Sequence, residues 1–347
     1  KPERFRQPEE LPQNFTADPI ARTHAPSCIQ RAPSTGVTGS EDCLFLNVAA
    51  PVGAKDLPVF FWVYGGGFVQ GDSWKYGIYN PTALVGKHNM IVVTINYRLG
   101  LFGFWASDYL KKNDPHFSTG NQAMLDQRMA LKWVNENIEA FGGDPNRVTI
   151  CGESAGGMSI LWHLSSPMSW KYFHQAIVQS GSNEDPLFYQ NYDNATLYYD
   201  YQARILGCDS NILTANQVDE CLVNLPSSNL ILQNSQIDSI SDERHKLPPF
   251  QPPKVVPTLA SPAWPMMPNA PVIDFSPVGL SGDPYNLLKM NKTAPVKLII
   301  GSNKDGGSLF LRTVPDIVPN VKLPITRGLG GPRTKINIPS SPGDDRR

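Results

Sequence analysis

The chain lacks both a strong net charge and any long apolar run. Its 347 residues carry 30 Lys and Arg against 31 Asp and Glu, so the formal net charge is −1. This balance gives no reason to expect nucleic acid or an anionic membrane as a partner. No apolar run approaches the roughly 20 residues that a membrane-spanning helix needs, so we expect no transmembrane segment. The chain starts with Lys-Pro-Glu and shows no signal peptide, which a processed or partial chain would lack in any case.

The composition is that of a folded protein. Hydrophobic residues make up 41% of the chain and aromatic residues 10%, which is enough to bury a core and excludes global disorder. We expect no cofactor and no metal. Sequons for N-glycosylation occur at Asn14, Asn194 and Asn291, about as often as chance predicts, so they are possible sites that do not decide the compartment.

The five cysteines are an odd number. Cys28 and Cys43 bracket one short loop, and Cys208 and Cys221 bracket another. Disulfides that close such loops are typical of secreted proteins, but buried free thiols would give the same spacing. Cys151 ends an apolar run and is expected to be a buried, inert thiol.

Apolar, β-branched runs alternate with helical patterns along much of the chain, which indicates an α/β protein with a largely parallel sheet. A helix is expected over Gln122–Ala140, because its apolar residues fall on one stripe, and Gly142-Gly143 end it. The runs expected to be buried strands are Val59–Tyr64, Ile91–Asn96, Val148–Cys151, Ala176–Gln179 and Val296–Ile300.

The alternation fails over residues 182–277. Within this stretch only Tyr198–Leu206 looks helical, and Leu247–Pro277 is dense in proline. A polyproline ligand is one interpretation of the proline-rich part, but we favour an ordered, irregular excursion over the face of the domain. Residues 327–347 are rich in Gly, Pro and charge, and we expect a disordered tail there. The expected organisation is therefore one partial domain over residues 1–326, followed by that tail.

Gly152-Glu153-Ser154-Ala155-Gly156 matches the nucleophile-elbow pattern G-x-S-x-G. Such a serine lies on a sharp turn from a strand to a helix, and bulky residues at the two glycine positions would collide with neighbouring backbone. The pentapeptide alone is a weak signal. Its context strengthens it, since Val148–Cys151 is a plausible strand before it and Met158–Leu164 a plausible helix after it.

Gly65-Gly66-Gly67 follows another expected strand. Attack on an ester carbonyl creates an oxyanion that needs preorganised N–H donors, and glycines let a backbone approach closely enough to provide them. A glycine triplet also occurs in flexible hinges. Its place after a strand and upstream of an elbow favours the oxyanion loop of an esterase.

Many motifs occur in the same order as in a known family, and on these the sequence resembles the type-B carboxylesterase/cholinesterase family. The resemblance covers about residues 4–311 and is strongest over 41–182. The motifs are Glu41–Asn47, Tyr64–Phe68, Asn96-Tyr97-Arg98, Gly120-Asn121-Gln122, Gly142–Pro145, the elbow, and Gln179–Ser182.

The resemblance implies an α/β-hydrolase fold, with helices on both faces of a mostly parallel sheet. It implies that Ser154 is the nucleophile and that Gly66, Gly67 and Ala155 donate the oxyanion-hole N–H groups. It also implies disulfides Cys28–Cys43 and Cys208–Cys221, and with them a secreted or luminal location. Ile29–Asp42 contains no aromatic residue, whereas cholinesterases place a tryptophan for choline in this loop, so a general carboxylic ester is the expected substrate.

The sequence also departs from the family. The triad acid of the family lies in a Lys-Asp-Glu-Gly motif, but here Lys304-Asp305-Gly306-Gly307 places Gly306 at that position. The triad histidine of the family lies well beyond this point. The six histidines of this chain match no such position, and they are His24, His88, His116, His163, His174 and His245.

We therefore expect a serine carboxylesterase lineage that lacks parts of the family fold at both ends. The fold is expected to be incomplete at the C-terminus, and the chain to be catalytically impaired. The alternatives are a non-catalytic adhesion or binding protein of the same fold, as in neuroligins, and a truncated product without function. The intact Ser154 and its glycines favour descent from an esterase.

Overall fold

The computed structural model describes residues 3–10, 25–32, 36–74, 77–181, 189–236 and 269–304. All of them lie in one compact unit, Lys1–Gly306. Within these ranges no helix is both long and apolar enough to cross a bilayer.

The strands are β1 (Gln30–Ala32), β2 (Gly36–Thr38), β3 (Leu46–Ala49), β4 (Leu57–Val63), β5 (Ile91–Ile95), β6 (Gly143–Glu153), β7 (Gln175–Gln179), β8 (Gln190–Asn191), β9 (Val272–Ile273) and β10 (Lys297–Gly301). The α-helices are α1 (Thr82–His88), α2 (Gly100–Phe104), α3 (Asp108–Asn113), α4 (Gln122–Asn137), α5 (Ala155–Leu164), α6 (Tyr192–Ile205), α7 (Ala215–Asn224), α8 (Ser227–Gln236) and α9 (Pro284–Lys289).

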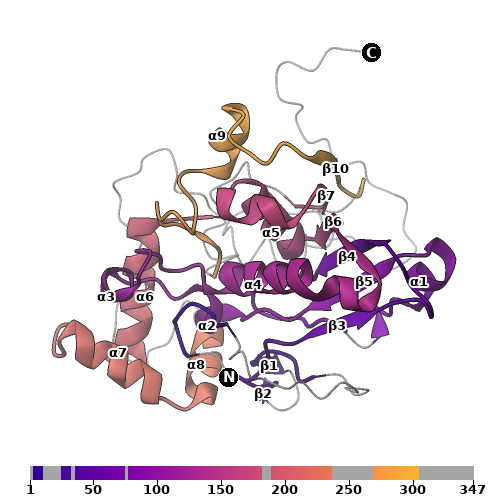
Figure 1. Ribbon diagram of the computed structural model, residues 1–347. Helices are drawn as coiled ribbons and strands as arrows, with labels where there is room; N and C mark the ends of the chain where they lie inside the picture. Colours follow the sequence, from indigo (N-terminus) through magenta and orange to yellow (C-terminus); the bar gives the residue numbers. More distant parts are fainter. Residues whose placement is uncertain are drawn as a thin grey trace, which may run out of the picture. The chain divides into compact units, whose positions relative to one another are not determined.

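A six-stranded sheet in the order β10-β7-β6-β4-β5-β3 forms the centre of the unit (Figure 1). All neighbouring pairs are parallel except β3 with β5. The five strands expected from apolar runs are all present, which confirms an α/β protein with a mostly parallel sheet. The antiparallel edge strand β3 was not expected as a strand, because Asn47 interrupts its short run of apolar residues.

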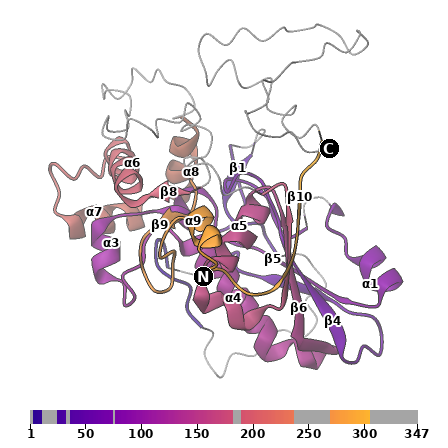
Figure 2. The same ribbon diagram turned by 90° about the horizontal axis from the view of Figure 1, so that it is seen from above.

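Helices cover the sheet on both faces, as expected. α4 connects β5 to β6, and α5 connects β6 to β7. Both crossovers run in the same direction along the sheet, so these two helices share one face. The crossover from β4 through α1 to β5 runs the opposite way, and a right-handed connection then puts α1 on the other face (Figure 2).

The central helix α4 agrees with the sequence pattern. Met124, Leu131 and Val134 lie on its apolar stripe and are fully buried. The expected end at residue 140 corresponds to a short 3-10 turn, Ile138–Phe141, and Gly142 caps this turn with a φ of 80°. A residue with a side chain rarely adopts this backbone conformation, so the glycine ends the helix for a physical reason.

Three helices, α6 to α8, occupy part of the stretch that we expected to be an irregular excursion. The expected helix Tyr198–Leu206 begins earlier, at Tyr192. The start of α7 carries a local signal that the sequence analysis overlooked: the Thr214 hydroxyl accepts from the N–H of Gln217, whose side chain accepts from the N–H of Thr214. The proline-rich part over 237–268 and the expected tail lie outside the described residues.

Candidate active site

Ser154 lies at the sharp turn between β6 and α5. Its φ of 56° and ψ of −122° are strained for a residue with a side chain. The strain is held from both sides: the Ser154 N–H donates to the carbonyl of Gln179 at 2.9 Å, and the Ser154 carbonyl accepts from Met158 N at 2.9 Å. The side chain is therefore presented at the carboxyl end of the sheet by a fixed backbone, which is the arrangement of a nucleophile elbow.

The glycines of the elbow are required by close backbone packing. A Cβ on Gly152 would lie 2.4 Å from the carbonyl oxygen of Gly156, and one on Gly156 would lie 2.1 Å from that of Val63. Real Cβ atoms do not approach backbone so closely, since packed interiors leave no such overlap. The elbow therefore packs directly against the end of β4, where the glycine loop begins.

The glycine loop lies against Ser154. A Cβ on Gly65 would be 2.5 Å from the carbonyl oxygen of Glu153 and 3.0 Å from Cβ of Ser154. Gly66 and Gly67 have φ values of 125° and 62°, and a Cβ on Gly66 would overlap the carbonyl of Gln70. Only glycine can trace this path without strain. The start of the glycine loop therefore packs directly against the Ser154 turn.

Two tyrosines fix the start of this loop. The Tyr64 hydroxyl donates to the carbonyl of Tyr97 at 3.1 Å, and the Tyr97 hydroxyl donates to the carbonyl of Tyr64 at 2.9 Å. Their rings stack with centroids 4.4 Å apart, and both side chains are fully buried. Burial raises the pKa of each phenol well above its usual value, so both remain neutral donors.

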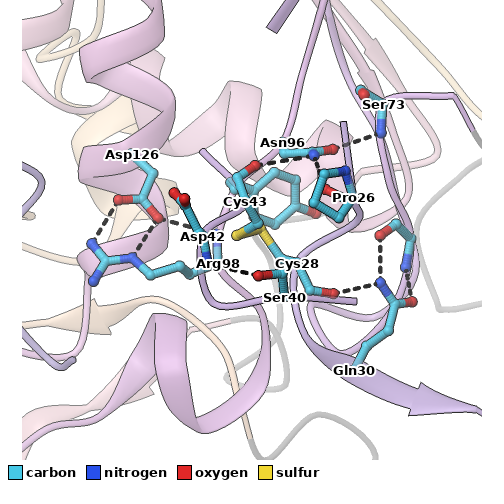
Figure 3. The surroundings of a disulfide bond; sticks show 12 residues. Pro26, Cys28, Gln30, Ser40, Asp42, Cys43, Ser73, Asn96, Arg98 and Asp126 are labelled. Atoms are coloured by element: carbon cyan, nitrogen blue, oxygen red, sulfur yellow. Dashed lines mark hydrogen bonds and ion pairs between the residues drawn. A yellow bond between two sulfur atoms is a disulfide. The ribbon is translucent and has the colours of Figure 1, made fainter. Parts of the chain in front are cut away.

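The first disulfide loop holds the other end of the glycine loop (Figure 3). The structure contains the disulfide Cys28–Cys43, with the two Cα atoms 4.8 Å apart. Next to it, the Gln30 side chain bonds both the carbonyl and the N–H of Gly71. Asn96 accepts from the N–H of Ser73 and donates to the carbonyl of Cys43. Sequence reasoning gave neither Gln30 nor Asn96 this role, because nothing local in the sequence shows it.

Arg98 and Asp126 form a buried ion pair beside this network (Figure 3). Two guanidinium nitrogens of Arg98 donate to the carboxylate at 2.6 and 2.7 Å, and the backbone N–H of Arg98 donates to it as well. This satisfies both buried charges, which a single contact would not. The pair fixes the start of α4 against the segment that follows β5.

The second expected disulfide, Cys208–Cys221, is also present, and Cys151 is a buried free thiol. Burial raises the pKa of Cys151 to about 12. The thiol is therefore protonated at neutral pH and unreactive, as expected. Beside Ser154, partial burial raises the pKa of the Glu153 carboxyl.

His163 is a core residue rather than a base for Ser154. It lies nine residues along α5 from Ser154, which is about 14 Å of helical rise. Its Nδ1 bonds the Ser169 hydroxyl at 3.0 Å and its Nε2 bonds the Gln127 amide oxygen at 3.1 Å. Burial, aided by the nearby charge of Arg128, lowers the pKa of His163 well below its usual value, so the ring is neutral.

The other described histidines lie elsewhere. His174 comes just before β7, and its N–H donates to the carbonyl of Val148. Val148 lies six residues, or about 20 Å of strand, from Ser154 along β6, so His174 is at the opposite end of the sheet. His88 ends α1, ahead of β5, and His116 is exposed in the loop before α4.

Several expected residues have no described placement. Asn14, His24, His245 and Gly306 lie outside the described residues. Of the other sequon residues, Asn291 is exposed in a turn after α9, and Asn194 is half-buried in the first turn of α6. Among the described residues no group of three His, Cys, Asp or Glu side chains is placed to hold a metal ion.

Comparisons with known proteins show the family of the chain. Residues 1–324 match the model of the family described as the carboxylesterase family. A fumonisin B1 esterase of Sphingopyxis macrogoltabida is 45% identical over 186 residues, which are 52% of this chain and 34% of that protein. Acetylcholinesterase 1 of Caenorhabditis elegans is 33% identical over 90% of this chain and 48% of its own length. The chain thus spans about half, or less, of the length of these relatives.

Solved structures show the same fold. A PNB esterase superimposes with a TM-score of 0.70 and 33% identity, over 88% of this chain and 57% of that one. A thermophilic PNB esterase gives a TM-score of 0.70 and 31% identity, with the same coverage. These matches confirm the α/β-hydrolase fold that the family resemblance implies.

Proposed function

The chain belongs to the carboxylesterase family, and we propose that it carries the nucleophile and oxyanion hole of a carboxylic ester hydrolase. In this proposal Ser154 attacks the ester carbonyl, and Gly66, Gly67 and Ala155 donate N–H groups to the oxyanion. The observation that carries the proposal is the contact of the Gly65 backbone with the strained Ser154 turn. Ala155 opens α5, so its N–H has no acceptor within the helix and is free to serve an oxyanion.

The reaction would follow the acyl-enzyme route. The Ser154 hydroxyl adds to the carbonyl carbon and loses its proton to a base. The tetrahedral oxyanion then collapses and expels the alcohol, which takes up a proton. Water hydrolyses the resulting ester of Ser154 and releases the acid. Each step needs a group that accepts and returns a proton beside the serine.

We further propose that the 347-residue chain turns over esters poorly. No described histidine lies beside Ser154, and the position expected for the triad acid is Gly306. A serine hydroxyl without a base is a weak nucleophile, and loss of a triad member leaves only about 10³–10⁴-fold acceleration over water.

The proposed substrate is a small carboxylic ester rather than a choline ester. Ile29–Asp42 offers no aromatic face for a choline cation. The similar proteins named as a fumonisin B1 esterase and PNB esterases fit a family that acts on varied esters. The alternative, a non-catalytic binding protein, would not need the strained backbone that Ser154 keeps.

Hydrolysis of a p-nitrophenyl ester by the 347-residue chain, with Ser154→Ala as control, tests the proposed impairment. We expect the same slow rate for both proteins. Turnover of the chain at rates typical of enzymes, if Ser154→Ala abolishes it, would contradict the impairment. It would also reveal a base among the other residues.

A second experiment tests the nucleophile itself without needing a base. Ser154→Cys introduces a thiol, which ionises unaided near pH 8.5. Incubation with p-nitrophenyl acetate should acetylate residue 154 faster than the buried Cys151, as read by peptide mass spectrometry. Equal or no labelling at residue 154 would contradict the site.

We also propose that the chain folds in the secretory pathway. The two short-loop disulfides fit an oxidising compartment, and Asn291 is the described sequon best exposed for a glycan. Expression in secreting eukaryotic cells should give both disulfides on non-reducing peptide mapping, and a glycan that Asn291→Gln removes and Asn194→Gln does not. Recovery of either cysteine pair as free thiols would contradict this location.

A further inference from the structure

Arg128 is a buried cation whose direct hydrogen-bond partners are all neutral. Its side chain extends from α4 to the end of α5 and to the 3-10 turn Pro167–Tyr172, and only 9% of the residue is exposed. Nε donates to the Ser169 hydroxyl at 2.9 Å, and Nη2 donates to the Ser166 hydroxyl at 2.7 Å. Because removing an uncompensated charge from water is costly, a group of opposite charge is expected beside it.

The other arginines in the described ranges show how unusual Arg128 is. Besides Arg128, the arginine without an ion pair is Arg31, which is exposed on β1. The remaining arginines each pair with a carboxylate, and the pairs are Arg4 with Glu41, Arg6 with Asp219, Arg98 with Asp126, Arg147 with Asp144 and Arg204 with Asp200. Lys171, on the turn that contacts Arg128, lies over the ring of Tyr172 and pairs with no described carboxylate. Positive charge therefore collects here without a counter-ion.

The negative groups nearest to Arg128 do not fill this gap. Burial lowers the pKa of Arg128 to about 10 against the opposing effects of Tyr172 and Asp274, so the side chain is still a cation at neutral pH. The Asp274 carboxylate already accepts from five donors, more than the roughly four lone-pair sites of a carboxylate. These donors are the N–H groups of Thr119, Ser276 and Leu280 and the hydroxyls of Ser118 and Ser276. The carbonyl end of α5 contributes at most about half a negative charge.

Two hydrogen-bond donors at this point have no acceptor within the described part of the chain. Nη1 of Arg128 makes no hydrogen bond and is not enclosed, so a ligand can approach it. The guanidinium carbon lies 4.9 Å from the ring centroid of Trp162. The indole N–H of Trp162, which is fully buried, has no acceptor either. A cation with unfilled donors around it fits an acceptor that carries negative charge.

We propose that Arg128 binds a small monovalent anion, a halide or a carboxylate, at the open side of its guanidinium. Nη1 would donate to the anion, while Nε and Nη2 keep their bonds to the two serine hydroxyls. One charge needs compensation and one guanidinium nitrogen is open, so a monovalent anion fits better than a phosphate, which favours bidentate pairing. Trp162 lies eight residues, or about 12 Å of helical rise, from Ser154 along α5, so the site is separate from the elbow. The inference does not depend on the role of Ser154.

Chloride binding to the 347-residue chain is the first test. Chloride that exchanges with a protein site has a broadened chlorine NMR line, and we expect this broadening to decrease when bromide or acetate competes. Arg128→Gln removes the charge and the open donor, so it should lower the affinity for chloride about tenfold or more. Arg147→Gln is the matched control, because the Arg147 side chain is 48% exposed and pairs with Asp144.

A second variant tests the site even if Arg128→Gln does not fold. Lys171→Glu changes an exposed residue and places a carboxylate on the turn that contacts Arg128, so it should weaken anion binding. Lys55→Glu makes the same change of charge in an exposed loop before β4 and is the matched control. Urea denaturation between about 5 and about 200 mM chloride should raise the folding constant of Lys55→Glu about fourfold more than that of Lys171→Glu, as one site with a Kd of about 50 mM would.

Competition between anions identifies the source of the ligand. Stronger competition by acetate than by bromide would assign the site to a carboxylate, and the reverse order would assign it to a halide. Phosphate that competes more strongly than both would overturn the monovalent assignment. The proposal would also be overturned by chloride broadening that no anion reduces, by a folded Arg128→Gln protein that binds chloride as tightly as Arg147→Gln, or by equal chloride dependence of stability in Lys171→Glu and Lys55→Glu.

Discussion

The Gln30 side-chain amide donates to the carbonyl of Gly71 at 2.8 Å, and its oxygen accepts from the N–H of Gly71 at 2.9 Å. Gly71 follows the glycine loop by four residues, and Gln30 lies inside the loop closed by Cys28–Cys43. Tyr97 holds the other end of the glycine loop at the Tyr64 carbonyl. The candidate oxyanion donors are therefore positioned by residues from two distant segments.

We expect Gln30→Ala to loosen the glycine loop. The substitution removes three buried hydrogen bonds, two with Gly71 and one from the Gln30 amide to the carbonyl of Cys28. It leaves the Gly71 backbone groups unpaired, at a cost of about 1–3 kcal/mol of unfolding free energy for each buried group left without a partner. Hydrogen exchange of residues 65–74 should accelerate. Arg31→Ala, an exposed neighbour on β1, is the control and should leave this exchange unchanged. Equal exchange in the two variants would show that Gln30 does not hold the loop.

Gly156→Ala should prevent stable folding of the elbow. The added methyl would lie 2.1 Å from the Val63 carbonyl, so either α5 or β4 must move. Overpacking of this kind costs about 1–3 kcal/mol or more. Gly86→Ala is the matched control, because Gly86 lies within α1 with no atom near its Cβ position, and alanine there should stabilise by up to about 1 kcal/mol. Urea denaturation of both variants measures the difference. A Gly156→Ala protein as stable as the parent would contradict the packing described for the elbow.

The parts of the fold that the sequence predicted are those with local signals. β5 is apolar at every position except Thr94, and all five of its residues are buried. The elbow was recognisable because its glycines are required within five residues of one another, where a pattern shows them. The pairing of the cysteines came from the family resemblance, because spacing alone does not determine long-range pairing. The antiparallel edge strand β3 was missed.

The supporting network of the site was invisible for the same reason. Gln30 and Gly71 are 41 residues apart, and Tyr64 and Tyr97 are 33 apart. No periodicity links such residues. Nothing in the sequence around a glutamine or tyrosine at these positions indicates its hydrogen-bond partner. The sequence already separated His163 from the position of the family's triad histidine, but its buried partners Gln127 and Ser169 required the structure.

Tyr97→Phe should destabilise the loop without disturbing the aromatic stack. Phenylalanine keeps the ring that stacks on Tyr64 but removes the donor to the Tyr64 carbonyl, which is buried. An unpaired buried carbonyl costs about 1–3 kcal/mol. Tyr109→Phe is the control, because the hydroxyl of Tyr109 bonds Asn216 at the surface, where water replaces the partner. Thermal unfolding followed by near-UV circular dichroism should show the larger loss for Tyr97→Phe, and equal losses would contradict the proposed role of its hydroxyl.

His163 should make the stability of the protein fall below about pH 6.5. Burial lowers its folded-state pKa, so between that value and the unfolded pKa of about 6.5 the unfolded chain binds a proton that the folded chain does not. The unfolding free energy then decreases as the pH falls, by up to about 1.4 kcal/mol per pH unit for this one group.

His163→Gln removes the titrating ring, so the stability of this variant should depend less steeply on pH between 6.5 and 5. The loss of buried hydrogen bonds lowers its stability at every pH. His116→Gln, in an exposed loop, should keep the slope of the parent protein. Urea denaturation at several pH values gives both slopes. An unchanged slope in His163→Gln would mean that the ring takes up protons equally in the folded and unfolded states, which would contradict the lowered pKa.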